Sequence, residues 1–196
     1  MSLTAENTLE HVVRPFVAPS DVGLADLRDA SARENLVQVV QHLFFTSLRA
    51  NQCPDRDGFY LTMHYQACGG WVSEQRKIGT VPPDKEDKYR NFSREKCIRL
   101  SGYPDHVCSM QSRNPELDRY GGAIKVRGGF VGISGLPETY DEIGSTSASL
   151  CVGLISFEDA EAIMDASKKA QSSTGKEVYP VAQGLVLGLL DTVYGS

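Results

Sequence analysis

The sequence lacks the concentrated positive charge that proteins use to bind nucleic acids. Its 196 residues contain 20 Lys and Arg against 25 Asp and Glu, which gives a net charge of −5. A phosphate backbone is bound through a clustered Lys/Arg surface, because the release of counterions drives the association. The charge balance therefore argues against nucleic acid as a partner.

The sequence also has no apolar run of the length that crosses a bilayer, which is about 20 residues. Its most apolar segment, residues 178–194, is shorter and contains Pro180. The first residues show no basic stretch followed by an apolar core, which a secretory signal requires. We therefore expect no membrane partner and a cytoplasmic location.

Paired cysteines are missing. The five cysteines are scattered, none stands at Cys-x-x-Cys spacing, and their odd number leaves at least one thiol unpaired. His64 with Cys68, or His106 with Cys108, lacks the second pair that a zinc finger needs. We expect free thiols in a reducing compartment and no metal site.

The glycine motifs of nucleotide-binding and hydrolytic enzymes are absent as well. Gly121 and Gly122 lack the lysine and the spacing of a Walker or dinucleotide motif. Ser134 precedes a glycine but does not stand in a Gly-x-Ser-x-Gly elbow. The helix start that follows carries acidic residues, which would compete with an anion for its amides. A phosphate-binding loop is disfavoured.

The remaining composition is that of an ordinary globular domain, with 41% hydrophobic and 23% charged residues. The length suits one domain with a sizeable core. We expect a single α+β domain over residues 23–170, preceded by an arm at residues 1–22. A polar linker and an apolar helix are expected over residues 171–196, in the core or at the interface of a homo-oligomer.

Hydrophobic periodicity locates the elements of that domain. Strict alternation over residues 59–67 predicts a half-buried strand. Glycines at a turn between residues 123–126 and 130–134 predict a hairpin, since glycine adopts positive φ without a Cβ clash. Apolar residues three and four apart predict helices over residues 24–48, 84–99, 136–154 and 156–169.

The polar run from Ser109 to Glu116 concentrates residues able to carry chemistry, and we expect the working surface there. Sites usually lie on such loops over a rigid frame. Arg113 is the leading candidate, because a guanidinium can hold a carboxylate by two parallel bonds. Further substrate-binding candidates are His64, Gln111, Asn114 and Ser134. The alternative is a solvated loop in which residues such as Ser112 and Asn114 only cap turns.

Acid–base chemistry would fall to His106 and Glu116. Histidine titrates near neutral pH, with a reference pKa of ~6.5, and a positioned carboxylate can transfer protons. Asp105 precedes His106, but neighbours in an extended segment point in opposite directions, so they form no ready dyad. A surface turn histidine is the alternative reading of His106, and a structural strand histidine that of His64.

The hairpin and the helix start resemble the closing signature of the GlcG-like family. That signature has a paired-glycine hairpin, a Gly-Val-Ser-Gly-like strand end and an Asp-Glu helix start. The matching positions are Gly121, Gly122, Ser134, Gly135, Asp141 and Glu142. The family's usual Val-Asp-x-x-Gly strand turn near the N-terminus is not recognisable. The family includes haem-binding extracellular sensor proteins and a domain attached to some cobalamin adenosyltransferases.

The resemblance implies a profilin-like antiparallel sheet of about five strands flanked by helices, often assembled as dimers or rings. It implies a small-molecule-binding protein whose ligand is an organic acid or a haem-like cofactor, and the cofactor stays unknown. The alternative is a small cofactor-independent lyase or isomerase acting on an aromatic or hydroxy acid, for example with hydroxylaminobenzoate-lyase-like activity. A third reading is an assembly protein with the C-terminal helix as its interface.

Overall fold

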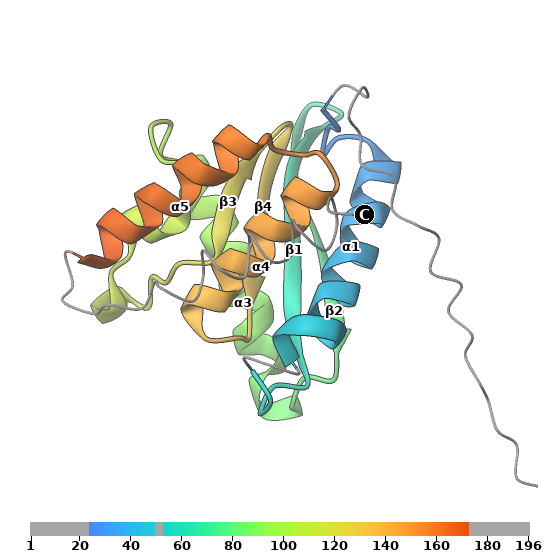
Figure 1. Cartoon of the computed structure of the whole chain (residues 1–196), viewed down its shortest axis with the longest axis vertical. Helices are drawn as coiled ribbons and strands as arrows, with labels where there is room; N and C mark the ends of the chain where they lie inside the picture. The colour runs from blue at the N-terminus through green and yellow to red at the C-terminus, as the bar shows by residue number, and fades with distance from the viewer. Residues whose placement is uncertain (1–23, 50–52, 173–196) are drawn as a thin grey trace, which may run out of the picture.

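The computed structural model describes residues 24–49 and 53–172 (Figure 1). The described elements follow in the order α1 (Ala30–Leu43), η1 (Phe44–Leu48), β1 (Gly58–Ala67), β2 (Gly70–Gly79), α3 (Pro83–Ser101), η2 (Ser109–Ser112), η3 (Pro115–Leu117), β3 (Ala123–Val126), β4 (Gly129–Ser134), α4 (Glu138–Cys151) and α5 (Phe157–Ser172). The predicted α+β class is confirmed.

The strands form one antiparallel sheet in the order β2-β1-β4-β3. Two hairpins, β1-β2 and β3-β4, meet through the pairing of β1 with β4. The sheet has four strands in the described part of the chain, fewer than the expected five or so. The strand-like piece after His106 makes a single bridge, Cys108 to Ile124, because the chain turns into the 3-10 helix η2 at Ser109.

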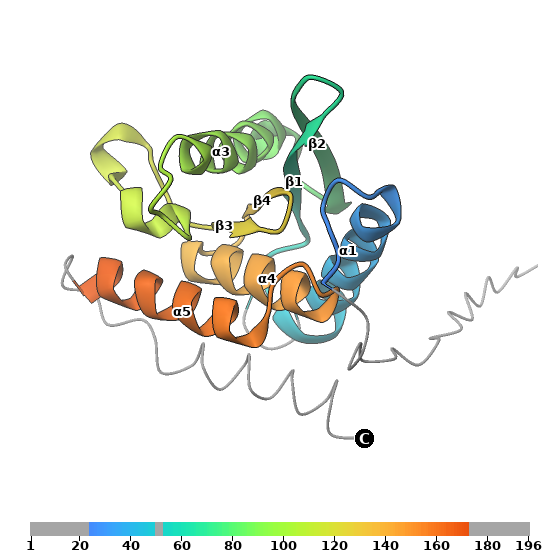
Figure 2. The same ribbon diagram turned by 90° about the horizontal axis from the view of Figure 1, so that it is seen from above.

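The alternation in β1 divides its side chains between two helical layers, which Figure 2 shows on opposite sides of the sheet. Phe59, Leu61 and Met63 are fully buried in the main core, which they share with side chains of α1 and α4. α5 packs on α4 and on η2 on the same side. Burying such side chains stabilises the fold by about 1.5–3 kcal/mol each.

The opposite face of the sheet is covered by α3. Thr62 of β1 hydrogen-bonds Ser93 of α3 at 2.8 Å, and Cys97 packs beside Phe130 of β4. Gly132 makes this approach possible, because a Cβ at that position would lie 2.7 Å from the Cys97 sulfur. A larger residue at Gly132 would push α3 away from the sheet.

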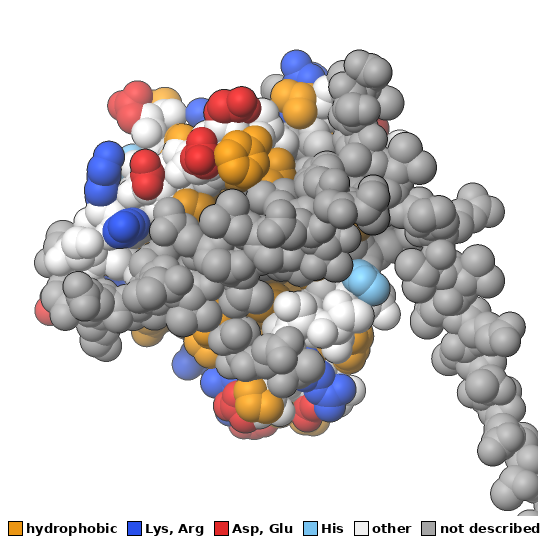
Figure 3. All heavy atoms as spheres, viewed as in Figure 1, with side chains coloured by type: hydrophobic (Ala, Val, Ile, Leu, Met, Phe, Trp, Pro, Cys, Tyr) orange, Lys and Arg blue, Asp and Glu red, His pale blue; other side chains and the backbone are white. Residues whose placement is uncertain are grey.

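The expected arm at residues 1–22 and apolar helix at residues 178–194 lie outside the described residues. Among the helices that are described, none combines the length and the apolar character that a membrane crossing requires. On the visible face in Figure 3, basic and acidic side chains are interspersed and form no single basic area over the described residues.

Candidate functional site

The polar loop before β3 is held in place by Arg99 of α3, which is only 9% exposed. Its guanidinium donates to the carbonyls of Ser109 at 2.9 Å, Ser112 at 3.2 Å and Tyr120 at 2.5 Å, and also to the Ser112 hydroxyl. Its Nε pairs with Glu95 at 2.7 Å. One buried cation therefore joins both ends of the loop to α3.

Two of the predicted substrate-binding residues support this loop from within. The Gln111 side-chain oxygen accepts from the amides of Val107 at 2.7 Å and Cys108 at 3.1 Å. Asn114 accepts from the amide of Glu116 at 3.2 Å and so caps η3. Both side chains have local structural roles, which agrees with the turn-capping alternative for this part of the loop.

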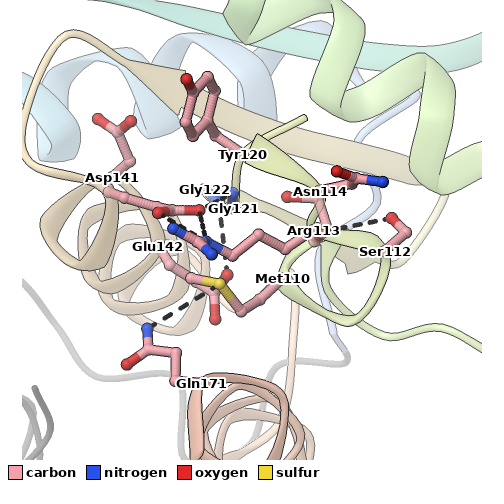
Figure 4. Close-up of polar contacts among 12 residues, drawn as sticks. Met110, Ser112, Arg113, Asn114, Tyr120, Gly121, Gly122, Asp141, Glu142 and Gln171 are labelled. Carbon is pink, nitrogen blue, oxygen red and sulfur yellow. Dashed lines mark hydrogen bonds and ion pairs between the residues drawn. The ribbon is translucent and has the colours of Figure 1, made fainter. Parts of the chain in front are cut away.

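Arg113 points toward the start of α4 (Figure 4). Its Nε donates to both carboxylate oxygens of Glu138, at 2.9 and 3.0 Å. Glu138 in turn accepts from the Gly121 amide at 2.6 Å. Within the described part of the chain, the terminal nitrogens of Arg113 make no hydrogen bond, and the side chain is 19% exposed. Glu138 thus fixes the guanidinium of Arg113 through Nε, and the two terminal nitrogens are oriented to bind a second carboxylate.

The paired glycines lie against α4. The Gly122 amide donates to Glu142 Oε2 at 3.4 Å, and the Gly122 carbonyl accepts from the Ser145 hydroxyl at 2.9 Å. A Cβ at Gly121 would collide with the Met110 side chain and lie 3.2 Å from Glu142 Oε2. Glycine at both positions therefore lets the backbone reach the helix.

Asp141 forms a buried ion pair with Lys96 of α3. The two charged atoms are 2.7 Å apart, and Lys96 also donates to the Ile133 carbonyl at 2.9 Å. Asp141 accepts from the Leu136 amide at 3.0 Å through its other oxygen. Burial raises the pKa of Asp141 to about 6, against the lowering effect of the Lys96 ammonium. The pair joins α3 to α4 through the sheet.

Among the described residues, Glu142 has no cation paired with it. Its side chain is fully buried, and no hydrogen bond from the described residues reaches its Oε1 atom. Burial raises the pKa of Glu142 to about 7, and the Ser167 hydroxyl and the Gly122 amide only partly oppose this. Glu142 is therefore a carboxyl that can gain or lose a proton near neutral pH.

No protein-family model, curated protein or solved structure significantly matches this chain. Its site must therefore be judged from its own geometry. Four of the residues that resemble the GlcG-like signature meet there, since Gly121 and Gly122 lie against the helix turn that carries Asp141 and Glu142 (Figure 4).

His64 lies away from this cluster. It is buried on the α3 face of β1 and hydrogen-bonds Ser73 at 2.8 Å beneath the stacked ring of Trp71. Burial lowers its pKa. Ser134 pairs with Tyr60, which is four residues from His64 along β1. Ser134 and His64 are therefore separated by roughly 13 Å along the strand direction. The structure places Ser134 in the buried sheet and does not group His64 with Arg113.

Among the described residues, neither predicted acid–base side chain hydrogen-bonds Arg113 or Glu138. His106 stacks on Tyr103 with ring centroids 4.7 Å apart, on the stretch that borders β3 near Lys125. Its Nδ1 is buried and has no partner among the described residues. Glu116 is exposed on the 3-10 turn η3. No hydrogen bond or ion pair between described residues joins either side chain to Glu142, which lies against the paired glycines.

Haem, which the family resemblance implies, does not fit this site. A haem iron needs an axial ligand such as His, Met or Cys. Cys108 is fully buried and Met110 is 1% exposed and packed against Gln171, so neither presents its sulfur to a ligand. Among the residues that the structure describes, no three His, Cys, Asp or Glu side chains gather as metal ligands either.

Lys96 and Arg99 were not predicted as site residues, although Lys96 holds Asp141 and Arg99 holds the polar loop. Both stand in a helix of mixed charge, where a lysine or arginine is normally solvated. The available signal was their spacing from Ser93 and Cys97, which places Lys96 on the inner face of α3. Asp141 is the complementary signal, because an acidic residue on the buried face of α4 needs a cation as its partner.

Proposed function

We propose that this protein is of the GlcG-like type and binds a small organic acid at Arg113. The proposal rests on the hydrogen bonding of the Arg113 guanidinium. Glu138 accepts from its Nε, and the terminal nitrogens are left to bind a ligand. A carboxylate is the group that matches this planar fork. Four family-motif residues meeting around Gly121 and Glu142 support the same location.

An aromatic acid is the ligand class that the neighbouring side chains favour. Tyr120 immediately precedes the paired glycines, and its ring lies 5.6 Å from that of Phe92 on α3. Both rings are only partly buried. Partly exposed aromatic rings on the loop that also carries Arg113, and on the helix packed against it, suit a ligand that has a ring and a carboxylate.

Replacing Arg113 with alanine is expected to weaken binding of an aromatic acid such as benzoate by roughly 10- to 100-fold, the loss of one charge-assisted hydrogen-bonding group. Thermal shift with benzoate, 4-hydroxybenzoate and glycolate measures this, since a ligand that binds only the folded state raises its stability. Benzylamine serves as the ligand of opposite charge and should have no effect.

The matched control is Arg119→Ala, which removes the same charge from an exposed residue of the same loop. Glu138→Gln tests whether Arg113 works only as a partner of Glu138, because it removes the ion pair and keeps the Arg113 fork. An equal carboxylate response in wild type, Arg113→Ala and Arg119→Ala would rule out the clamp.

A second candidate function is a cofactor-independent lyase or isomerase, and Glu142 is the observation that favours it. A buried carboxyl with a pKa of about 7 holds a proton at a pH where it can also release it. Glu142 lies beside Gly121, whose amide contacts the same Glu138 that orients Arg113. A substrate held by Arg113 would present its reacting group toward this part of α4.

Glu142→Gln is expected to abolish turnover of hydroxylaminobenzoate or of aromatic hydroxy acids, with a loss of about 100-fold or more, because general acid–base catalysis contributes that much. Ligand binding at Arg113 should survive the substitution. Turnover is followed by ultraviolet absorption from pH 5 to 9, and wild type should show a limb near pH 7. Undiminished turnover in Glu142→Gln would contradict the acid–base role.

A further inference from the structure

Strand β2 is one of the two outer strands of the sheet (Figure 1). The other, β3, is bordered by residues 107 and 108 through the Cys108–Ile124 bridge and the bond from the Lys125 amide to the Val107 carbonyl. All residues of β2 pair with β1 without a break, from Gly58 opposite Gly79 to Ala67 opposite Gly70. In the described part of the chain, no strand pairs with its other side. β2 contains neither a proline nor a bulge, two of the devices that block an edge, but it does carry charged side chains, which block pairing unless the second strand brings the opposite charges. Its outer amides and carbonyls form a ready template for another strand.

We propose that β2 pairs antiparallel with β2 of a second copy of this chain, centred on Gln75. The two sheets would then form one continuous sheet, with α3 of both copies on the same side. Two-fold symmetry about an axis perpendicular to the sheet requires that opposed residues lie on the same face. Only registers centred on a residue of β2 meet that requirement.

Charge distinguishes the three registers at the middle of the strand. Centring the pair on Glu74 places two glutamates opposite each other, and centring it on Arg76 places two arginines opposite each other, which is destabilising. Centring it on Gln75 places Glu74 opposite Arg76 of the second copy, twice by symmetry. Both Glu74–Arg76 pairs then join opposite charges.

The same register also matches the apolar and small residues of β2. Val72, which is 41% exposed, comes to lie opposite Ile78 of the second copy. Trp71, which is 53% exposed, comes opposite Gly79, where no side chain obstructs the indole. The Trp71 ring is already fixed on His64, with centroids 4.8 Å apart and 14° between the planes. Pairing would cover the most exposed aromatic side chain of this strand.

Ion pairs within one copy already orient the charged side chains of β2 that would meet the second copy. Glu74 contacts Arg76 at 2.5 Å and Arg33 of α1 at 3.1 Å within one copy. Arg76 is 47% exposed, so its guanidinium can also reach Glu74 of the second copy. The interface would thus carry alternating acidic and basic groups on the α1 side of the sheet.

Arg76→Glu is expected to weaken dimerisation of the full chain at least about tenfold, because it places glutamates opposite each other at two symmetric positions. Sedimentation velocity over a range of concentrations measures this. The charge swap Glu74→Arg with Arg76→Glu should restore the dimer. Lys85→Glu, the same charge change at an exposed residue of α3, should leave it unchanged.

A cross-link locates the axis independently of the charges. In a Cys68→Ser background, Gln75→Cys should form a covalent dimer on mild oxidation, since directly opposed Cβ atoms lie ~5 Å apart. Lys77→Cys should not, because its two copies lie roughly 13 Å apart. A monomer at all concentrations, a dimer unaffected by Arg76→Glu, or equal cross-linking at both positions would overturn the proposal.

Discussion

Replacing Lys96 with methionine is expected to lower the free energy of unfolding by about 3–5 kcal/mol, the cost of leaving a buried charge without its partner. Lys96 is 2% exposed and contacts Asp141 at 2.7 Å, so no water can replace the ammonium. The Ile133 carbonyl would lose a hydrogen bond in the same variant. Urea denaturation at pH 7.5 measures the change.

The double variant Lys96→Met with Asp141→Asn should recover part of that loss. The asparagine oxygen can still accept from the Leu136 amide, and the uncompensated charge is gone. Lys85→Met, an exposed lysine of the same helix, should change stability by less than about 0.5 kcal/mol. A loss below about 1 kcal/mol for Lys96→Met would show that the ion pair does not hold α3 to α4.

Replacing Glu142 with glutamine is expected to stabilise the protein by about 3 kcal/mol at pH 8 and to change little at pH 4.5. The pKa of Glu142 is raised to about 7 by burial, above the ~4.3 of an unfolded glutamate. Its favourable contribution is complete below the unfolded pKa and is lost as the pH rises through the folded pKa. Glutamine keeps the neutral shape at every pH.

Urea denaturation of wild type and Glu142→Gln between pH 4.5 and pH 8.5 measures this difference. The two curves of stability against pH should diverge between about pH 4.3 and pH 7, the window that the unfolded and folded pKa values define, and run parallel above it. Glu161→Gln, an exposed glutamate of α5, should follow wild type throughout. Parallel curves over the whole pH range for wild type and Glu142→Gln would mean that Glu142 is already ionised in the folded protein.

Much of the fold could be predicted from local pattern. The alternation over residues 59–67 matches β1, and the glycine hairpin matches β3 and β4, because both signals act between residues close in sequence. The expected helix over residues 24–48 begins only at Ala30 and ends in a π-helical turn. The strand-like piece after His106 forms only the Cys108–Ile124 bridge, because the length of a strand depends on partners that lie far along the chain.

The site was less predictable because its contacts are long-range. Arg113 was identified as a group that can hold a carboxylate, but its partner Glu138 stands 25 residues away. Lys96 and Asp141 are 45 residues apart, and neither has a local pattern that reveals the other. Conversely, Gln111 and Asn114 looked like ligand-binding residues although their bonds are local caps.

In the proposed complex, the terminal nitrogens of Arg113 hold the carboxylate of a ligand while Glu138 keeps its Nε. Side-chain nitrogen NMR of the full chain during titration with 4-hydroxybenzoate tests it most directly. We expect the Arg113 Nη signals to shift and their exchange to slow, while the Nε signal stays unchanged because Nε remains bonded to Glu138. Unchanged Arg113 signals at a concentration of 4-hydroxybenzoate that stabilises the protein would contradict it.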